Sequence, residues 1–132
     1  MARYLLDADA VIDFLAGFPP SVIVIRQLHV EGNVLCVCNV VVAEVYAGLH
    51  ANRELAAEEF LGQMTHLTTS ADAAKQAGKW RLTFRRRGQT LSITDMLIAA
   101  TAVEHDATVV TGNWRHFPMN EVRVLPLPRP LR

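Results

Sequence analysis

The sequence has few cysteines, and they are not arranged for a disulfide framework. Cys36 and Cys38 are its only cysteines, and they stand two positions apart in an apolar segment, without CxxC spacing. This pattern excludes a small disulfide-stabilised scaffold and a cysteine-based zinc site. We predict that both thiols are buried as small hydrophobic groups in a protein of a reducing compartment.

Long hydrophobic runs are also absent. The longest apolar segments, such as Met96–Val103, are far shorter than the ~20 residues that a membrane-spanning helix needs. Asp7, Asp9 and Asp13 interrupt the N-terminal region where a secretory signal would have an unbroken apolar stretch. The sequence therefore predicts a soluble, cytoplasmic protein with no membrane partner.

Neither sign of charge is in excess. The 13 Lys and Arg residues balance 13 Asp and Glu residues in a chain of 132 residues, of which 51% are hydrophobic. A chain of this length typically forms one domain and buries ~65–70% of the surface that its unfolded form exposes. We therefore expect one domain over residues 1–132. Any contact with nucleic acid must come from a local cluster of charge.

Short apolar segments alternate with helical segments along the chain. We predict strands at 4–6, 34–38, 66–67, 108–111 and 122–125, and helices at 9–17, 21–30, 39–49, 53–64, 70–88 and 95–104. Asp9 and Asn39 are expected helix N-caps, and Pro19 and Pro20 are expected to end the first helix. Residues 126–132 contain three prolines and predict an extended tail that cannot pair in a sheet. The alternation indicates an α/β fold with a central, mainly parallel sheet.

Two acidic residues stand where such a fold gathers its reactive groups. Asp7 ends the first predicted strand, and reactive groups of parallel α/β sheets lie beyond the carboxyl ends of the strands. A turn or helix-cap aspartate is the alternative for Asp7, and capping is the favoured role of Asp9.

Glu44 lies in a helix that is apolar on nearly every side, so we expect it to be buried and paired with an arginine or a metal ion. Gly48, one turn further along, leaves open space beside its carboxylate.

Asp95 resembles Glu44 in its surroundings. It lies in the first turn of another apolar helix, where Ser92-x-x-Asp95 also fits a capping box. Taken alone, Asp95 indicates a cap; together with Asp7 and Glu44 it indicates a site. Three converging carboxylates repel one another unless a cation is shared, and oxygen ligands without histidine or thiolate suit Mg²⁺ or Mn²⁺. Hydrolysis of a phosphodiester is the chemistry that this arrangement serves best.

Four segments together resemble one known family. They are residues 4–13, Ala43–Leu49, Ser92–Ala102 and Val109–Phe117. In their order and spacing over the chain, the sequence resembles the PIN-domain family, and within it the VapC toxins of bacterial toxin–antitoxin modules. The resemblance implies a three-layer α/β/α fold with a mainly parallel sheet of 4–5 strands. It also implies an endoribonuclease in which Asp7, Glu44 and Asp95 bind one or two Mg²⁺ or Mn²⁺ ions. A homodimer, silenced by a co-encoded antitoxin, is the implied assembly.

The fourth motif departs from the family's pattern. Many relatives have an acid at the position of Asn113 or of His116, and this sequence has neither. Asn113 can still ligate through its carbonyl oxygen or hold a metal-bound water, so we include it among the catalytic candidates. His116 can contact phosphate or orient a water, or be an ordinary surface histidine. Thr94 and Thr111 can steady a water or a ligand beside Asp95 and Asn113, or be structural.

The sequence contains one obvious basic cluster. It consists of Arg81, Arg85, Arg86 and Arg87. Arginine is suited to phosphate, so the cluster is a candidate RNA contact; cations at a helix C-terminus are the alternative explanation. A catalytically silent PIN-like module that binds RNA or protein is the second functional hypothesis, supported by the uncharged Asn113. A small phosphatase is the third and weakest.

Overall fold

The computed structural model describes residues 1–130. Five strands are present: β1 (Arg3–Leu6), β2 (Val34–Cys38), β3 (Thr65–Leu67), β4 (Ala107–Thr111) and β5 (Val124–Pro126). The helices are α1 (Ala8–Leu15), α2 (Pro19–Val30), α3 (Asn39–Gly48), α4 (Glu54–Gly62), α5 (Ala71–Arg86) and α6 (Ile93–Glu104), with short 3-10 turns η1 (Ala51–Arg53) and η2 (Trp114–His116). Every predicted strand and helix is therefore present, with shifts of a few residues at the ends.

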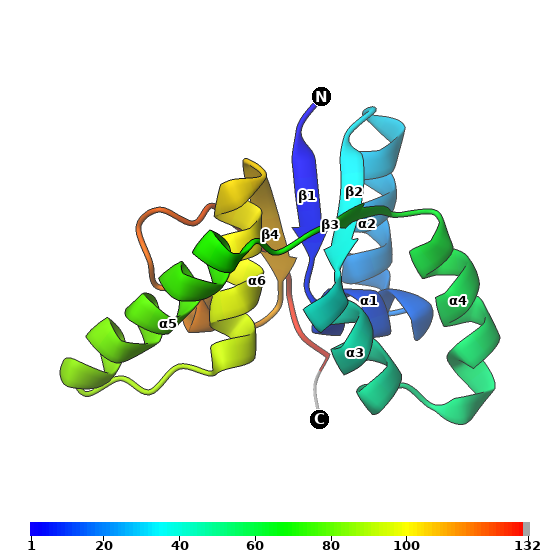
Figure 1. The fold of residues 1–132 in the computed structure, drawn as a ribbon. Helices are drawn as coiled ribbons and strands as arrows, with labels where there is room; N and C mark the ends of the chain where they lie inside the picture. Colours follow the sequence, from blue (N-terminus) through cyan, green and yellow to red (C-terminus); the bar gives the residue numbers. More distant parts are fainter. Residues whose placement is uncertain (131–132) are drawn as a thin grey trace.

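The sheet is entirely parallel, with strand order β3-β2-β1-β4-β5. Leu5 and Leu6 in β1 and Val109 and Val110 in β4 are fully buried, as expected for strands covered on both faces. Figure 1 shows α2 behind β2 and α6 in front of β4. The predicted α/β/α fold with a central parallel sheet is confirmed.

Both cysteines lie in β2 and are buried and unpaired, as predicted. Burial raises the pKa of each thiol, so both stay protonated and act as small apolar groups. Among residues 1–130 no single helix is long and apolar enough to cross a membrane. Helices α1 and α2 pass that test only as a pair, and they are bent by 106° at their junction.

Four predictions about where helices and strands begin or end were wrong. Asp7, not Asp9, is the N-cap of α1, and Cys38, not Asn39, precedes α3. The two prolines begin α2 rather than ending α1, because the first helical positions need no backbone N–H donor. Pro126 pairs with Thr111 as the last residue of β5, since an edge strand tolerates a proline. Residues 131 and 132 of the predicted tail lie outside the described residues.

The parallel arrangement brings distant segments to one edge of the sheet. In Figure 1 the arrowheads of β1, β2 and β4 point toward the edge where α1 and α3 begin and where the C-terminal tail ends. Asp7 follows β1, and Gly112 and Asn113 follow β4, its neighbour in the sheet. The residues that carry the predicted chemistry therefore meet at this carboxyl edge.

Candidate active site

Asp7 is buried at the carboxyl edge of the sheet, with 4% of its surface exposed. Its backbone N–H donates to the Val110 carbonyl at 3.0 Å, which extends the pairing of β1 with β4. One carboxylate oxygen accepts from the N–H of Ala8 at 2.9 Å, and the other accepts from the Thr111 hydroxyl at 2.8 Å. Asp7 therefore caps α1 and also lies among the polar side chains at the carboxyl edge of the sheet, so its two predicted roles are compatible.

Asp9 belongs to the same cluster, which the sequence analysis did not favour. Its Oδ2 accepts from the backbone N–H of Gly112 at 2.8 Å, and its Oδ1 lies 3.3 Å from the Thr111 hydroxyl. The N–H of Asn113 donates to that hydroxyl at 2.9 Å. Thr111 therefore connects Asp7, Asp9 and the segment after β4, and the predicted positioning role of this threonine has a structural basis.

The carboxylates interact through their charges. The pKa of Asp7 is raised to about 7, first by burial and then by the Asp9 and Asp95 carboxylates, while hydrogen bonds from Thr111 and Ala8 partly oppose the rise. Burial also raises the pKa of Glu44, and the charges of Asp95 and Asp9 add to that rise against a hydrogen bond from Thr94. Asp7, which precedes α1, therefore shares one electrostatic environment with Asp9 of α1, Glu44 of α3 and Asp95 of α6.

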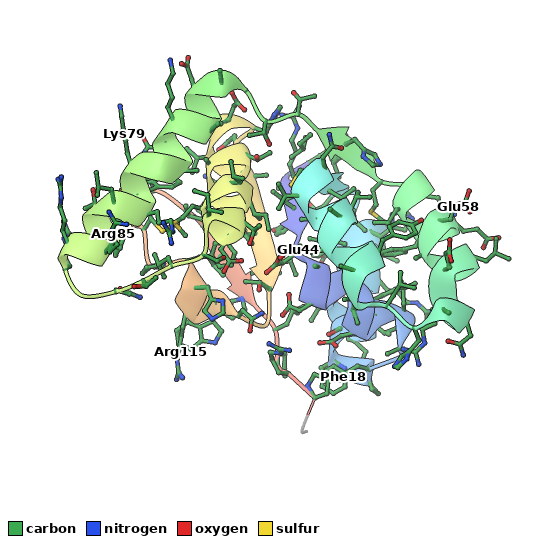
Figure 2. All side chains as sticks on the ribbon, turned by 60° about the horizontal axis from the view of Figure 1, so that its bottom comes forward. Phe18, Glu44, Glu58, Lys79, Arg85 and Arg115 are labelled. Carbon is green, nitrogen blue, oxygen red and sulfur yellow. The ribbon has the colours of Figure 1, made fainter. Side chains whose placement is uncertain are left out.

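Glu44 lies in the middle of the molecule in Figure 2, on α3. The prediction that α3 is buried on all sides was wrong: Val41 and Val45 are buried, but Tyr46 is 42% exposed, and Glu44 itself is half-buried. Helix α3 packs against α1, α4, α6 and β2, and these contacts cover Val41 and Val45 but not Tyr46. Within the described part of the chain no arginine forms an ion pair with Glu44, so the structure does not support the arginine alternative.

Asp95 enters the site from the first turn of α6. Its backbone N–H donates to the Ser92 hydroxyl at 3.1 Å, so Ser92 is the N-cap of α6, as the sequence indicated. The Asp95 carboxylate contacts His116 Nδ1 at 3.2 Å, and its side chain is 15% exposed. Thr94 contacts the Ser92 hydroxyl at 3.2 Å. The structure therefore places His116 beside an acid of the cluster.

Asn113 faces a residue that the sequence analysis missed. Its side-chain oxygen accepts a hydrogen bond from the guanidinium of Arg129, in the C-terminal tail. No sequence motif indicated Arg129, because it stands between two prolines beyond the last strand. Its place beside β4 follows only from the tertiary fold.

The predicted basic cluster lies on a different part of the surface. Figure 2 shows Arg85 on α5, well apart from Glu44. The Arg81 side chain donates to the Leu91 carbonyl at 3.1 Å, whereas Arg85 and Arg86 are exposed in the last turn of α5. Arg81 therefore supports the connection between α5 and α6, and none of these arginines neutralises the carboxylates.

The acids suit a hard divalent cation. Over residues 1–130, no three histidine, cysteine, aspartate or glutamate side chains already form a group that could hold a metal ion. Mg²⁺ seldom needs such a cage, because it keeps several waters and binds through one or two carboxylates plus substrate phosphates. The pKa values of Asp7 and Glu44 are raised first by burial and then by the charges of the neighbouring acids, and a bound cation would offset both effects. The donor set therefore fits Mg²⁺ or Mn²⁺.

The sequence and the fold of this chain match a known family. The PIN domain family model matches residues 4–122, so the chain belongs to the PIN-domain family. Among curated relatives, ribonuclease VapC19 of Mycobacterium tuberculosis is 30% identical over 87% of this chain and 92% of its own. Ribonuclease VapC2 of Rickettsia felis is 24% identical over 86% of this chain and 89% of its own.

Solved structures share the fold. VapBC2 from Rickettsia felis, bound to a DNA fragment of its promoter, superposes with a TM-score of 0.79 at 20% identity, covering 95% of this chain and 98% of that one. VapC20 of Mycobacterium tuberculosis, a toxin that cleaves the sarcin–ricin loop, superposes with a TM-score of 0.62 at 16% identity, covering 91% and 98%. At this identity the likeness establishes the fold alone.

Proposed function

We propose that this protein is a divalent-metal-dependent endoribonuclease and the toxin component of a type II toxin–antitoxin system. The observation that carries the proposal is the carboxylate cluster of Asp7, Asp9, Glu44 and Asp95 at the carboxyl edge of a PIN-domain sheet. The names of the relatives as VapC ribonucleases support RNA as the substrate.

Each residue of the cluster has a distinct part in the proposed reaction. Asp7, Glu44 and Asp95 hold one or two Mg²⁺ or Mn²⁺ ions, and Asn113 is a further catalytic candidate. A cation bound there supplies an activated water and neutralises the charge that builds on the phosphate. Thr111 holds Asp7 in one orientation, and His116 does the same for Asp95. Asp9 adds negative charge that favours cation binding.

A protein antitoxin is the proposed partner. Solved structures of similar fold are VapBC complexes from Rickettsia felis and Salmonella typhimurium, which contain an antitoxin with the toxin. We further propose a homodimer in the cytoplasm, as the resemblance to VapC toxins implies.

Cleavage of RNA by the purified protein tests the proposal. We expect cleavage of RNA in Mn²⁺ or Mg²⁺, its loss in EDTA, and its loss in Asp95→Asn. Glu58→Gln, which removes an exposed charge on α4, is the matched control and should cleave normally. RNA binding without cleavage would favour the silent binding module that the uncharged Asn113 suggests. Turnover of a generic phosphomonoester would instead favour a phosphatase.

Removing the Thr111 hydroxyl should weaken the site without changing its charge. Thr111→Val keeps the shape of this fully buried residue but deletes its hydrogen bonds to Asp7, Asp9 and the Asn113 backbone. Mutating a residue that hydrogen-bonds a metal ligand typically lowers metal affinity or activity by ~10–100-fold. We expect a loss of that size in RNA cleavage. Thr111→Ser restores the hydroxyl and should recover most of the activity. Equal activity of the valine and serine variants would contradict this role.

A further inference from the structure

The C-terminal tail is fixed beside the active site. After β5, the N–H of Leu127 donates to the Thr111 carbonyl at 2.9 Å, and the Leu127 side chain is buried. Thr111 is the residue whose hydroxyl hydrogen-bonds Asp7. In Figure 1 the tail descends from the sheet to the edge where the strand arrowheads point. The tail therefore approaches the acids from the β4 side.

Arg129 lies over the segment that follows β4. A Cβ added to Gly112 would stand 2.6 Å from Cδ and 2.7 Å from Cγ of Arg129, and 2.8 Å from Oδ2 of Asp9. The methylene stem of Arg129 and the Asp9 carboxylate thus crowd the same glycine. The guanidinium continues to the side-chain oxygen of Asn113. Only glycine at position 112 lets the stem approach this closely.

The tail then crosses to the other side of the site. Pro130 lines a cavity together with Ile12 and Asp13 of α1 and Gly48 of α3. Arg129 therefore stands between the end of β4 and the helices that carry Asp9 and Glu44. Arg129 is therefore close to Asp9 and Asn113, at the carboxyl edge that carries the acids.

In the part of the chain that the structure describes, the Arg129 guanidinium has no carboxylate partner. Its hydrogen bond goes to the uncharged Asn113. A guanidinium has five N–H donors, and it binds phosphate through two of them at once. The carboxylate cluster repels an approaching phosphate group, so a cation at its mouth is needed where the polyanion enters.

We propose that Arg129 is a phosphate-binding residue of the active site, supplied by the C-terminal tail and oriented by Asn113. This inference rests on the ribonuclease function proposed above. Arg129 contacts a phosphate of the RNA backbone beside the carboxylates, and the uncharged Asn113 leaves the guanidinium free for that contact.

RNA binding tests the proposal through its salt dependence. The full chain is titrated with a labelled single-stranded RNA in EDTA at several NaCl concentrations, and the fluorescence anisotropy is measured. One lost phosphate contact on a single strand lowers the slope of log K against log salt by about 0.7. We expect that change in Arg129→Ala, and an unchanged slope in Arg129→Lys, which keeps the charge. Arg26→Ala, which removes an exposed arginine on α2 near the opposite edge of the sheet, is the matched control and should leave the slope unchanged.

Cleavage kinetics provide the second measurement. Charged hydrogen bonds contribute about 1.5–3 kcal/mol, so Arg129→Ala should lose ~10–100-fold in kcat/KM with Mn²⁺ present. Arg129→Lys should recover part of this loss, because lysine cannot make the bidentate contact. Gly112→Ala should also lower kcat/KM, since the added methyl group displaces the methylene stem of Arg129. Gly62→Ala, on α4 with open space around it, is its control.

Each outcome separates the alternatives. Faster cleavage or tighter RNA binding by Arg129→Ala would mean that the tail covers the site instead of serving it, which overturns the inference. An unchanged slope, or an equal change in Arg26→Ala, also overturns it. A wild type that cleaves RNA while Arg129→Ala behaves identically leaves the proposed function intact. If the wild type neither binds nor cleaves RNA, both the Arg129 inference and the proposed ribonuclease function are contradicted.

Discussion

The Asp7→Asn variant is expected to be more stable than the wild type at pH 8 without metal, and to cleave RNA at less than ~1% of the wild-type rate. The catalytic loss follows from removing a proposed metal ligand, since losing even the partner of a ligand typically costs ~10–100-fold. The gain in stability follows from removing a buried charge that other acids surround.

The size of the gain follows from the pKa of Asp7. A rise from 3.8 to about 7 corresponds to about 4 kcal/mol of unfavourable free energy for the ionised folded state. Asparagine keeps the acceptor for the Ala8 N–H and is a good N-cap, but it loses a favourable charge at a helix N-terminus. We therefore expect a net gain of about 2–4 kcal/mol, and a Tm higher by about 5–15 °C.

Thermal and urea unfolding in EDTA measure this gain. Glu58→Gln changes the net charge by the same amount at an exposed position, so it should leave the Tm nearly unchanged. A lower stability of Asp7→Asn than of the wild type in EDTA would contradict the claim that the Asp7 charge destabilises the metal-free folded state. Normal cleavage by the variant would remove Asp7 from the proposed metal site.

The difference in stability between wild type and Asp7→Asn is expected to depend on pH. Between pH 3.8 and about 7 the folded protein holds the Asp7 proton more tightly than the unfolded chain. The free energy of unfolding of the wild type therefore falls as pH rises through this window, and the Asp7 contribution levels off above it. The variant lacks this contribution. The two proteins should be similar near pH 4 and differ by up to about 4 kcal/mol at pH 8.

Denaturant unfolding at pH 4, 6 and 8 in EDTA checks this dependence. Comparing the two proteins cancels most of the titration of other groups, including Glu44, whose pKa is also raised. Saturating Mn²⁺ should stabilise the wild type at pH 8, by about 2.7 kcal/mol at 100 times its Kd, and should have little effect on the variant. A stability difference that stays constant from pH 4 to 8 would contradict the raised pKa of Asp7.

The position of Asp7 could be predicted because strand direction determines it. A short apolar strand that ends in an acid must deliver that acid to the carboxyl edge of a parallel sheet, whatever the remainder of the chain does. Glu44 and Asp95 were predicted because an acid in an otherwise apolar helix is costly without a cation. Their roles as metal ligands stay predictions.

The contacts of Asp9 and Arg129 could not be predicted from the sequence. An acid at the start of a helix has the same local pattern whether it caps the helix or binds a distant group, so the contact of Asp9 with Gly112 could not be foreseen. Arg129 has no local signal, because its place beside Asn113 depends on the pairing of β5 with β4. The burial of α3 was overestimated because apolar composition does not show which side of a helix is covered.

Calorimetric titration of Mn²⁺ into the metal-free protein at pH 8 tests most directly whether these separated acids form one cation-binding centre. We expect saturable binding by the wild type and by Glu58→Gln. Asp7→Asn, Glu44→Gln and Asp95→Asn should each weaken it by at least ~10-fold. Absence of saturable binding by the wild type, or wild-type affinity in all three variants, would contradict a shared centre.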